Sequence, residues 1–328
     1  MPVRPFFALV CLFAAASLSA QQAAPPPLAT TQPPPYWAFT ANPPNAPAEP
    51  AGDAPQHLPN STQSYTLTQI QDLFAVPDWH PDAHPPMPDV VAHGRKPEMF
   101  ACAYCHLPNG LGRPENAGLA ALPNAYIVQQ MSDFQNGARK SALPDLLPVK
   151  LMVLVAAHAT SDESTAAAAY FSQLPPKPWI KVIETTRVPK THAAGWMLVP
   201  DEPHVLEPIG HRIIEVPVNL ELTELRDDTS SFLAYVPKGS LKKGRFLAAK
   251  GGNGITLPCA SCHGDDLRGK DNLPSIAGRS PSYIVRQLYD IQLGTRGGPG
   301  MAQMQPPVMK LSMDDMISIA AYLASLRP

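Results

Sequence analysis

Two copies of one pentapeptide constrain this chain more than any other feature. The 328 residues contain Cys102-Ala-Tyr-Cys105-His106 and Cys259-Ala-Ser-Cys262-His263, which share the pattern C-x-x-C-H. Two thiols one helical turn apart can each form a thioether with one vinyl group of a haem, and the next residue presents its imidazole to the iron. The sequence therefore predicts two covalently bound haem c groups, held by these four cysteines, with His106 and His263 as iron ligands.

Three other uses of the cysteines have to be weighed. The C-x-x-C pairs of a structural zinc site normally lie about 15 to 20 residues apart, whereas His106 and His263 are 157 positions apart (263 − 106). A thioredoxin-like redox pair belongs in a βαβ context, and disulfides are plausible only in an exported protein. None of these alternatives accounts for the histidine that follows both pairs. Covalent haem is the favoured interpretation.

The chain carries an internal repeat around the two pentads. At the offset of 157, residues 126–139 align with 283–296, and eight of these 14 positions are identical. Further on the offset falls to 152, so that Ala168-Ala169-Tyr170 aligns with Ala320-Ala321-Tyr322. Copy one therefore has five extra residues (157 − 152) before its last helix. Such a repeat predicts a duplicated haem domain.

The second offset selects a pair of methionines as the other axial ligands. A thioether opposite the histidine completes the coordination of many c-type haems. At the offset of 152, Met152 aligns with Met304, and no other pairing places Met in both copies. We therefore expect Met152 and Met304 to be the axial ligands. Met131, Met301 and Met309 are the competing candidates, and Met313 and Met316, inside the expected last helix, are interpreted as core filler.

Capping signals place helices around these ligands. Thr160 with Glu163, and Ser312 with Asp315, are typical of capping boxes and are followed by apolar runs that end near Leu174 and Leu326. Another helix is expected from Ser240 to about Gly251. Each copy should then contain a helix, the pentad, a second helix, a Met-bearing loop and a last helix, with the first helix of copy one shortened.

This arrangement resembles the class I c-type cytochromes, in particular their two-haem members. The resemblance covers about residues 88–176 and 236–328. It implies an all-α fold of two cytochrome c domains in tandem, with each haem in a core, and transfer of single electrons. In that family a proline about eleven residues past the haem histidine often supplies the carbonyl that orients the imidazole. Pro274 fits in copy two, but copy one has Ala117, so the surroundings of His106 depart from the family pattern.

Composition shifts divide the chain into five parts. Residues 1–20 have the basic, apolar and small-residue pattern of a signal peptide, with an uncleaved anchor as the alternative. Residues 21–60 contain 12 prolines in 40 positions, which predicts a disordered strap. We expect haem domains at 61–176 and 237–328. The linker 177–236 contains short β-branched runs, which predict short strands in an irregular segment.

Two further features bear on ligands and partners. The linker histidines His192, His204 and His211, together with His93 and His158, are possible axial replacements, although lone histidines are more often surface residues. With 25 Lys and Arg against 27 Asp and Glu, the chain lacks the basic excess of a nucleic-acid-binding protein.

The sequence predicts an exported, periplasmic electron carrier rather than an enzyme. Iron closed by six donors has no open position for a substrate. Its partners would be redox proteins, a dehydrogenase or an oxidase, that act as electron donor and acceptor, and no membrane span should remain after cleavage of the signal. Two alternatives stay open: a cytochrome subunit of a dehydrogenase or oxidase complex, and a two-haem peroxidase with one open iron.

Overall fold

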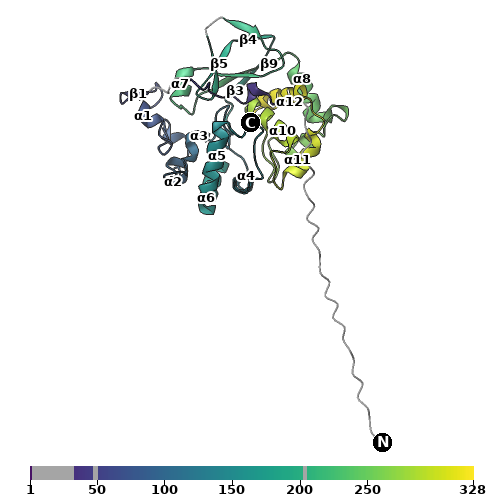
Figure 1. The fold of residues 1–328 in the computed structure, drawn as a ribbon, viewed down its shortest axis with the longest axis horizontal. Helices are drawn as coiled ribbons and strands as arrows, with labels where there is room; N and C mark the ends of the chain where they lie inside the picture. The colour runs from purple at the N-terminus through teal and green to yellow at the C-terminus, as the bar shows by residue number, and fades with distance from the viewer. Residues whose placement is uncertain (2–32, 47–50, 202–204) are drawn as a thin grey trace.

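The fold is that of a computed structural model, which describes residue 1 and residues 33–46, 51–201 and 205–328. The predicted signal peptide, apart from Met1, and His204 lie outside the described residues. Two helical regions, one from each copy, lie side by side beneath a group of short strands (Figure 1). Among the described residues, no helix combines the length and the apolar character needed to cross a membrane.

Copy one is built from six helices, of which the first two are short. Before them, a 3₁₀ turn, η1 (Tyr36–Ala38), and a hairpin of β1 (Pro55–His57) and β2 (Ser64–Thr66) lead into the copy. A further 3₁₀ turn, η2 (Pro81–Ala83), lies between the first two helices. The helices are α1 (Leu67–Ile70), α2 (Asp89–Ala92), α3 (Cys102–His106), α4 (Asn124–Gln135), α5 (Leu147–His158) and α6 (Ser161–Gln173).

Copy two repeats this order with a longer first helix. Its elements are α8 (Ser240–Lys250), the 3₁₀ turn η3 (Gly251–Asn253), α9 (Ala260–His263), α10 (Pro281–Leu293), α11 (Met301–Val308) and α12 (Met313–Ser325). Shifting the bounds of α6 by 152 gives 313 and 325, which are the bounds of α12. Thr160 and Ser312 both cap these helices through complete capping boxes, as the sequence predicts.

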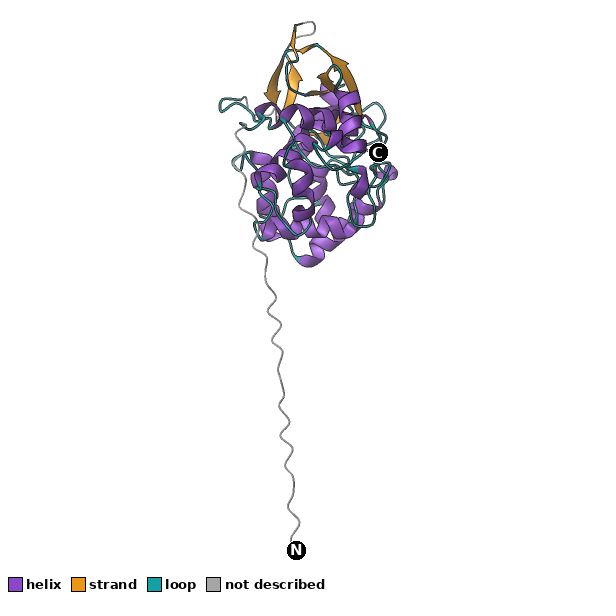
Figure 2. Cartoon of the chain, turned by 90° about the vertical axis from the view of Figure 1, so that its right-hand side faces the viewer, coloured by secondary structure: helices purple, strands orange, loops and turns teal. Residues whose placement is uncertain are grey.

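The linker contains more regular structure than the sequence predicts. Its described residues, 177–201 and 205–236, hold one helix, α7 (Leu220–Glu224), and seven strands: β3 (Ile180–Thr185), β4 (Arg187–Pro189), β5 (Thr191–Ala194), β6 (Met197–Pro200), β7 (Leu206–Pro208), β8 (Ile214–Pro217) and β9 (Phe232–Pro237). β9 is the centre of a three-stranded sheet, parallel to β3 and antiparallel to β8. The strands form a layer at one end of the molecule (Figure 2).

The linker contributes side chains to the cores of both copies. Phe232 is buried in the core of copy one, where its ring meets the Trp179 ring edge-on at 5.4 Å between centroids. Val236, four residues later on the same strand, is buried in the core of copy two. Because the two residues are four positions apart, they point to the same face of β9, and this face contacts copy one near the start of the strand and copy two near its end.

The Pro-rich strap, expected to be disordered, has ordered parts among its described residues. Ala38 and Phe39 are 1% and 3% exposed in the core of copy two, while Tyr36 remains 65% exposed. The Arg286 guanidinium donates hydrogen bonds to the carbonyls of Ala38 and of Pro114, both at 2.6 Å. Burial of the Ala38 and Phe39 side chains and the hydrogen bond from Arg286 stabilise this segment, which has little secondary structure of its own.

The expected Met-bearing loops are helices. Met152 lies in α5, which has 12 residues, and Met304 lies in α11, which has eight and ends after Pro306 and Pro307. Proline normally breaks a helix because it removes a donor. The end of α11 is stabilised from outside, because the Gln292 amide donates to the carbonyls of Val308 at 2.7 Å and Leu311 at 2.9 Å.

Candidate haem sites

Both histidines of the pentads are oriented by a backbone carbonyl. Nδ1 of His106 lies 2.8 Å from the carbonyl oxygen of Ala117, and Nδ1 of His263 lies 2.9 Å from that of Pro274. A carbonyl only accepts, so Nδ1 carries the proton and donates. Burial lowers the pKa of both imidazoles. Each ring is therefore neutral and keeps the lone pair of Nε2 for a metal.

The loop that orients His106 is stabilised by copy two instead of by a proline. The Arg279 guanidinium, 9% exposed, donates to the carbonyls of Gly118 at 3.1 Å and Ala120 at 2.9 Å. These residues directly follow Ala117. The missing ring constraint at position 117 is thus replaced by two charge-assisted hydrogen bonds from the other copy.

The cysteines have the environment of thiols rather than of zinc ligands. All four are free. Burial raises the pKa of Cys102 to about 12 and that of Cys259 to about 11. Among the described residues, no cysteine belongs to a group of three or more side chains that could share a metal ion. The zinc and disulfide interpretations therefore find no support in the geometry.

One continuous cavity of about 620 Å³ contains both pentads. Its wall includes all four cysteines, both pentad histidines and four methionines: Met131, Met152, Met301 and Met304. The exposed surface of the wall is mostly apolar, which fits a large apolar ring system better than a small polar substrate. The cavity would thus suit haem beside each pentad, held by the cysteines and the histidine there.

The structure reduces the set of candidate methionines and leaves Met301 and Met304 equivalent in copy two. Met309 is not part of the cavity wall, while Met301 and Met304 lie one turn apart on α11 and both reach it. In copy one, Met131 packs against the core of that copy. Met152 lines the cavity but does not belong to that core. This difference favours Met152 over Met131 as a ligand.

The alternative histidines lie away from the cavity. His158, His192 and His211 form ion pairs with Glu98, Asp201 and Asp314 at 2.8 Å each. His93 is exposed. These four do not line the cavity, as expected for surface residues.

Sequence reasoning did not anticipate a polar network between the copies. The Arg139 guanidinium donates to Oε1 of Gln130 in its own copy at 2.8 Å, and across the boundary to Oη of Tyr283 at 3.2 Å and Oε1 of Gln287 at 3.1 Å. Burial would raise the pKa of Tyr283, but the positive charges of Arg139 and Arg296 outweigh it, and the net direction is downward.

Arg296 makes the equivalent contacts in the opposite direction. It donates to Oε1 of Gln287 in its own copy at 2.9 Å, and across the boundary to Oη of Tyr126 at 2.8 Å and Oε1 of Gln130 at 3.1 Å. The six residues are identical pairs at the offset of 157. The identity of these polar residues in both copies was the sequence signal for the network, since buried polar side chains in a folded protein normally have hydrogen-bond partners.

The backbones of the two copies also pair where the network ends. The amide of Lys140 donates to the carbonyl of Thr295 at 2.8 Å, and the amide of Gly297 donates to that of Ala138 at 2.7 Å. Because the offset of 157 converts one bond into the other, the copies are related by an approximate two-fold axis here. The boundary is therefore a specific interface, to which the same surface of each copy contributes.

Comparisons with known proteins indicate the family of this chain. The sequence profile of a family described as Cytochrome c matches residues 248–327. A thiosulfate dehydrogenase electron acceptor from Thiomonas intermedia is 25% identical over 235 residues, which cover 70% of this chain and 80% of that protein. Cytochrome c4 from Azotobacter vinelandii is 31% identical over 87 residues, 24% of this chain and 41% of that protein.

A shorter relative is covered almost completely. Cytochrome c-554(547) from Halothiobacillus neapolitanus is 34% identical over 88 residues, which are 24% of this chain and 97% of that protein. Among solved structures, a thiosulfate dehydrogenase from Marichromatium purpuratum is 26% identical with a TM-score of 0.45, and the match covers 70% of this chain and 37% of that one. Because the relative from Halothiobacillus neapolitanus is 34% identical and 97% covered, and the profile matches the same family, the chain belongs to the cytochrome c family and resembles its two-haem class I members.

Proposed function

We propose that this chain is an exported carrier of single electrons with one haem c in each copy, the two haem domains being 61–176 and 237–328. The observation that carries the proposal is the single cavity that joins both pentads. Two redox groups in one cavity exchange electrons directly, so the protein can accept an electron at one haem and release it from the other. The pattern of residues 1–20 supports export.

The residues of the chain have separate roles in this proposal. The cysteines attach the haems, and the carbonyls of Ala117 and Pro274 orient the histidines. Haem iron, when bound, supplies the one-electron chemistry. The axial ligands that we propose are His106 with Met152, and His263 with Met304. The aliphatic wall excludes water, which favours outer-sphere electron transfer over reaction at the iron.

The two sites differ in their access to solvent. Leu257 and Leu273 line the cavity near the pentad of copy two and are 56% and 38% exposed. At the offset of 157, Leu257 corresponds to Phe100, which is partly buried and meets the Phe74 ring at 5.2 Å. We infer that redox partners exchange electrons through the edge of copy two, because residues near Phe74 cover the edge of copy one.

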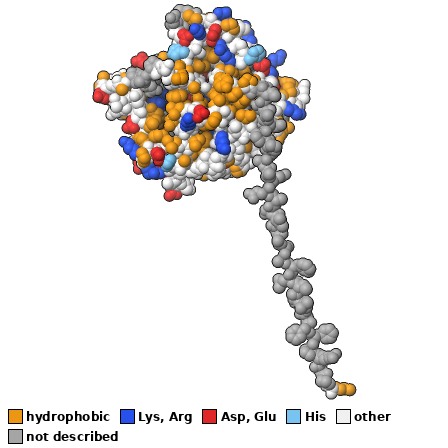
Figure 3. All heavy atoms as spheres, in the orientation of Figure 1, with side chains coloured by type: hydrophobic (Ala, Val, Ile, Leu, Met, Phe, Trp, Pro, Cys, Tyr) orange, Lys and Arg blue, Asp and Glu red, His pale blue; other side chains and the backbone are white. Residues whose placement is uncertain are grey.

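The surface on one side suits transient docking. Hydrophobic side chains gather across the middle of the face in Figure 3, and charged side chains lie mostly toward its rim. Such a surface permits short-lived complexes with fast dissociation. Since the relative from Thiomonas intermedia is named as the electron acceptor of a thiosulfate dehydrogenase, we propose a dehydrogenase as the electron donor of this chain.

A mass and a ligand-binding measurement test the carrier function. Protein matured in an export-competent host should carry two haems per chain, and replacement of Cys259 and Cys262 by Ala should leave one. Carbon monoxide should bind the reduced native protein slowly or not at all, and hydrogen peroxide should not be turned over. Rapid carbon monoxide binding to one haem, together with peroxide turnover, would contradict the carrier function and indicate a two-haem peroxidase.

A surface variant tests the docking site separately. Leu257→Lys should slow reduction of the protein by a purified thiosulfate dehydrogenase supplied with thiosulfate, at unchanged haem spectra. Val218→Lys is the matched control, since Val218 is 58% exposed in the linker, outside the cavity. Equal rates in the two variants would place the docking site elsewhere.

A further inference from the structure

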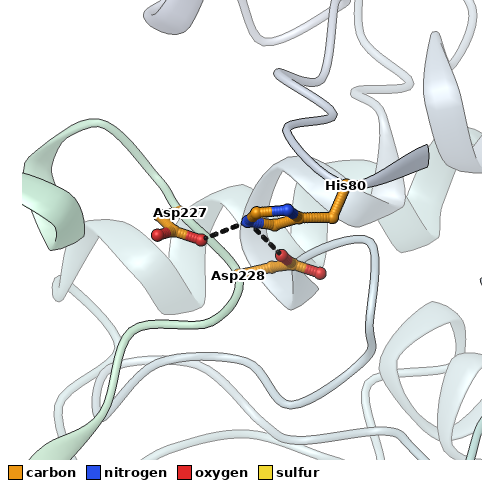
Figure 4. Close-up of side chains that lie close together, drawn as sticks. All are labelled: His80, Asp227 and Asp228. Atoms are coloured by element: carbon orange, nitrogen blue, oxygen red, sulfur yellow. Dashed lines mark hydrogen bonds and ion pairs between the residues drawn. The ribbon is translucent and has the colours of Figure 1, made fainter. Parts of the chain in front are cut away.

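A histidine and two aspartates converge at a place that the haem sites do not use. Nε2 of His80 lies 3.0 Å from Oδ1 of Asp227 and 4.0 Å from Oδ1 of Asp228. The potential ligand atoms of these three residues all lie within 4.8 Å of one another. The His80 imidazole faces both carboxylates, with Asp227 on one side and Asp228 on the other (Figure 4).

The side chain of Asp228 is buried with one carboxylate oxygen left without a hydrogen bond. The residue is 4% exposed, and its Oδ1 atom has no hydrogen-bond partner. A buried carboxylate oxygen without a partner costs folding free energy. The same oxygen faces His80, so a cation held between the two residues would satisfy it. Asp227, by contrast, already accepts from the amide and hydroxyl of Thr229.

The cluster is held in place by segments that are distant in sequence. The Trp79 indole donates to the carbonyl of Leu225 at 2.7 Å, which places His80 against the turn that carries both aspartates. Arg226 has φ 59° and adopts the left-handed conformation that bends this turn. The carboxylates are therefore positioned before any ligand arrives, which reduces the entropic cost of binding.

We propose that His80, Asp227 and Asp228 form a binding site for a divalent metal ion of the zinc type. One imidazole nitrogen and two carboxylate oxygens are ligands that Zn²⁺ accepts, and a tetrahedral site needs donor atoms about 3.3 Å apart. The observed 3.0 and 4.0 Å bracket this value. Two negative carboxylates match the charge of the ion, and a water molecule would complete the coordination.

The site would cross-link copy one to the linker. The Asn109 amide, three residues past His106, donates to the backbone carbonyl of Asp228. The Arg226 guanidinium donates to the carbonyl of Tyr104 at 2.9 Å and stacks on its ring at 3.8 Å. A bound ion would thus link His80 to the turn at Arg226–Asp228, which already forms hydrogen bonds with α3 and with Asn109 after it. Its effect is on the stability of copy one.

Calorimetric titration of the haem-loaded, EDTA-treated full chain with ZnCl₂ tests the site. We expect binding of one Zn²⁺ per chain at this site, and at least about tenfold weaker binding in His80→Gln and in Asp228→Asn. These two variants spare Asp227, whose contacts with Thr229 hold the turn. His192→Gln is the matched control: His192 pairs with Asp201 at 2.8 Å, but the pair is exposed and Lys190 shares the carboxylate.

X-ray absorption at the zinc edge gives a readout that needs no variant. The wild-type protein with one equivalent of Zn²⁺ should show a shell of nitrogen and oxygen with one imidazole and no sulfur. Haem absorption and far-ultraviolet circular dichroism verify that each variant is folded. Absence of binding to the wild type, unchanged affinity in both site variants, or a shell containing sulfur would each overturn the proposal.

Discussion

The Arg139 guanidinium of copy one donates a hydrogen bond to the Tyr283 hydroxyl of copy two, 3.2 Å away. The repeat generates the reciprocal contact, from Arg296 to Tyr126 at 2.8 Å. Residues retained in both copies therefore serve the contact between the copies. In the proposed two-haem carrier, this contact would hold the two haem sites at a fixed separation.

Loss of one arginine of this network should weaken the boundary. Arg296 is 7% exposed, and Arg296→Gln removes a buried charged donor from Tyr126, Gln130 and Gln287, of which only the two glutamines keep a hydrogen bond from Arg139. We expect a loss of about 2–3 kcal/mol in the free energy of unfolding, measured by urea titration of the haem-loaded protein. The control Arg245→Gln, at an exposed position on α8, should stay within about 0.5 kcal/mol. Equal losses would mean that the network contributes nothing specific.

Arg279 should control the mobility of the loop beside His106. The amides of Leu119 and Ala120 donate to the carbonyl of Gly110 at 2.7 and 2.9 Å, in the loop that Arg279 holds through Gly118 and Ala120. Arg279→Gln should accelerate hydrogen exchange of these two amides at least about tenfold. The half-exposed Arg268 is the control, and Arg268→Gln should leave their exchange unchanged. Unchanged exchange in Arg279→Gln would show that copy one stabilises this loop alone.

The methionine ligands can be separated by spectroscopy. Met152→Ala and Met304→Ala should each abolish the sulfur-to-iron charge-transfer absorption of one haem and lower its potential, because a thioether stabilises ferrous iron. Met131→Ala and Met309→Ala should leave both haems six-coordinate. Met301 is the sharpest competitor, since it shares the cavity wall with Met304. Loss of the band in Met301→Ala with its retention in Met304→Ala would show that the repeat alignment selects the wrong residue.

Acid should weaken copy one through the pair of Arg95 and Glu163. The Arg95 hydrogen bond, at 2.8 Å, is the main cause that lowers the pKa of Glu163 from 4.5 to about 2. A folded-state pKa below the unfolded value stabilises the fold above about pH 4.5, and this contribution is lost as the pH falls toward 2. In Arg95→Gln, unfolding stability should be lower at pH 7 and should fall less between pH 5 and 2.

Urea unfolding at pH 7, 4 and 2.5 measures this difference. Lys150→Gln is the control, because Lys150 pairs with Asp145 at 2.9 Å while that carboxyl is 92% exposed. Exposed pairs of this kind contribute little to stability. Parallel pH profiles for Arg95→Gln and the wild type would contradict the assignment.

The helices and the haem motifs were predictable because their signals are local. Thr160 and Ser312 cap their helices through contacts within four residues, and the pentads encode attachment chemistry in five. The change of offset from 157 to 152 is also visible in the sequence. In the structure, both offsets meet in one pair of hydrogen bonds. Gln135 donates to the carbonyl of Ala159 at 2.9 Å, and Gln292 donates to the carbonyl of Leu311 at 2.9 Å. The two donors are related by the offset of 157, and the two acceptors by the offset of 152.

The sequence by itself determined the repeat and the capped helices, and it predicts the four attachment cysteines and their histidines, since each of these signals is a short pattern along the chain. Only the tertiary structure decided the rest. Met304 lies on α11, at whose end the Val308 carbonyl accepts a hydrogen bond from Gln292 of α10, and Met152 lies on α5, whose C-cap carbonyl of Ala159 accepts one from Gln135 of α4. The Arg139–Tyr283 contact and the His80–Asp228 cluster join residues more than 140 positions apart. No local pattern encodes such contacts, because they exist only after the chain has folded.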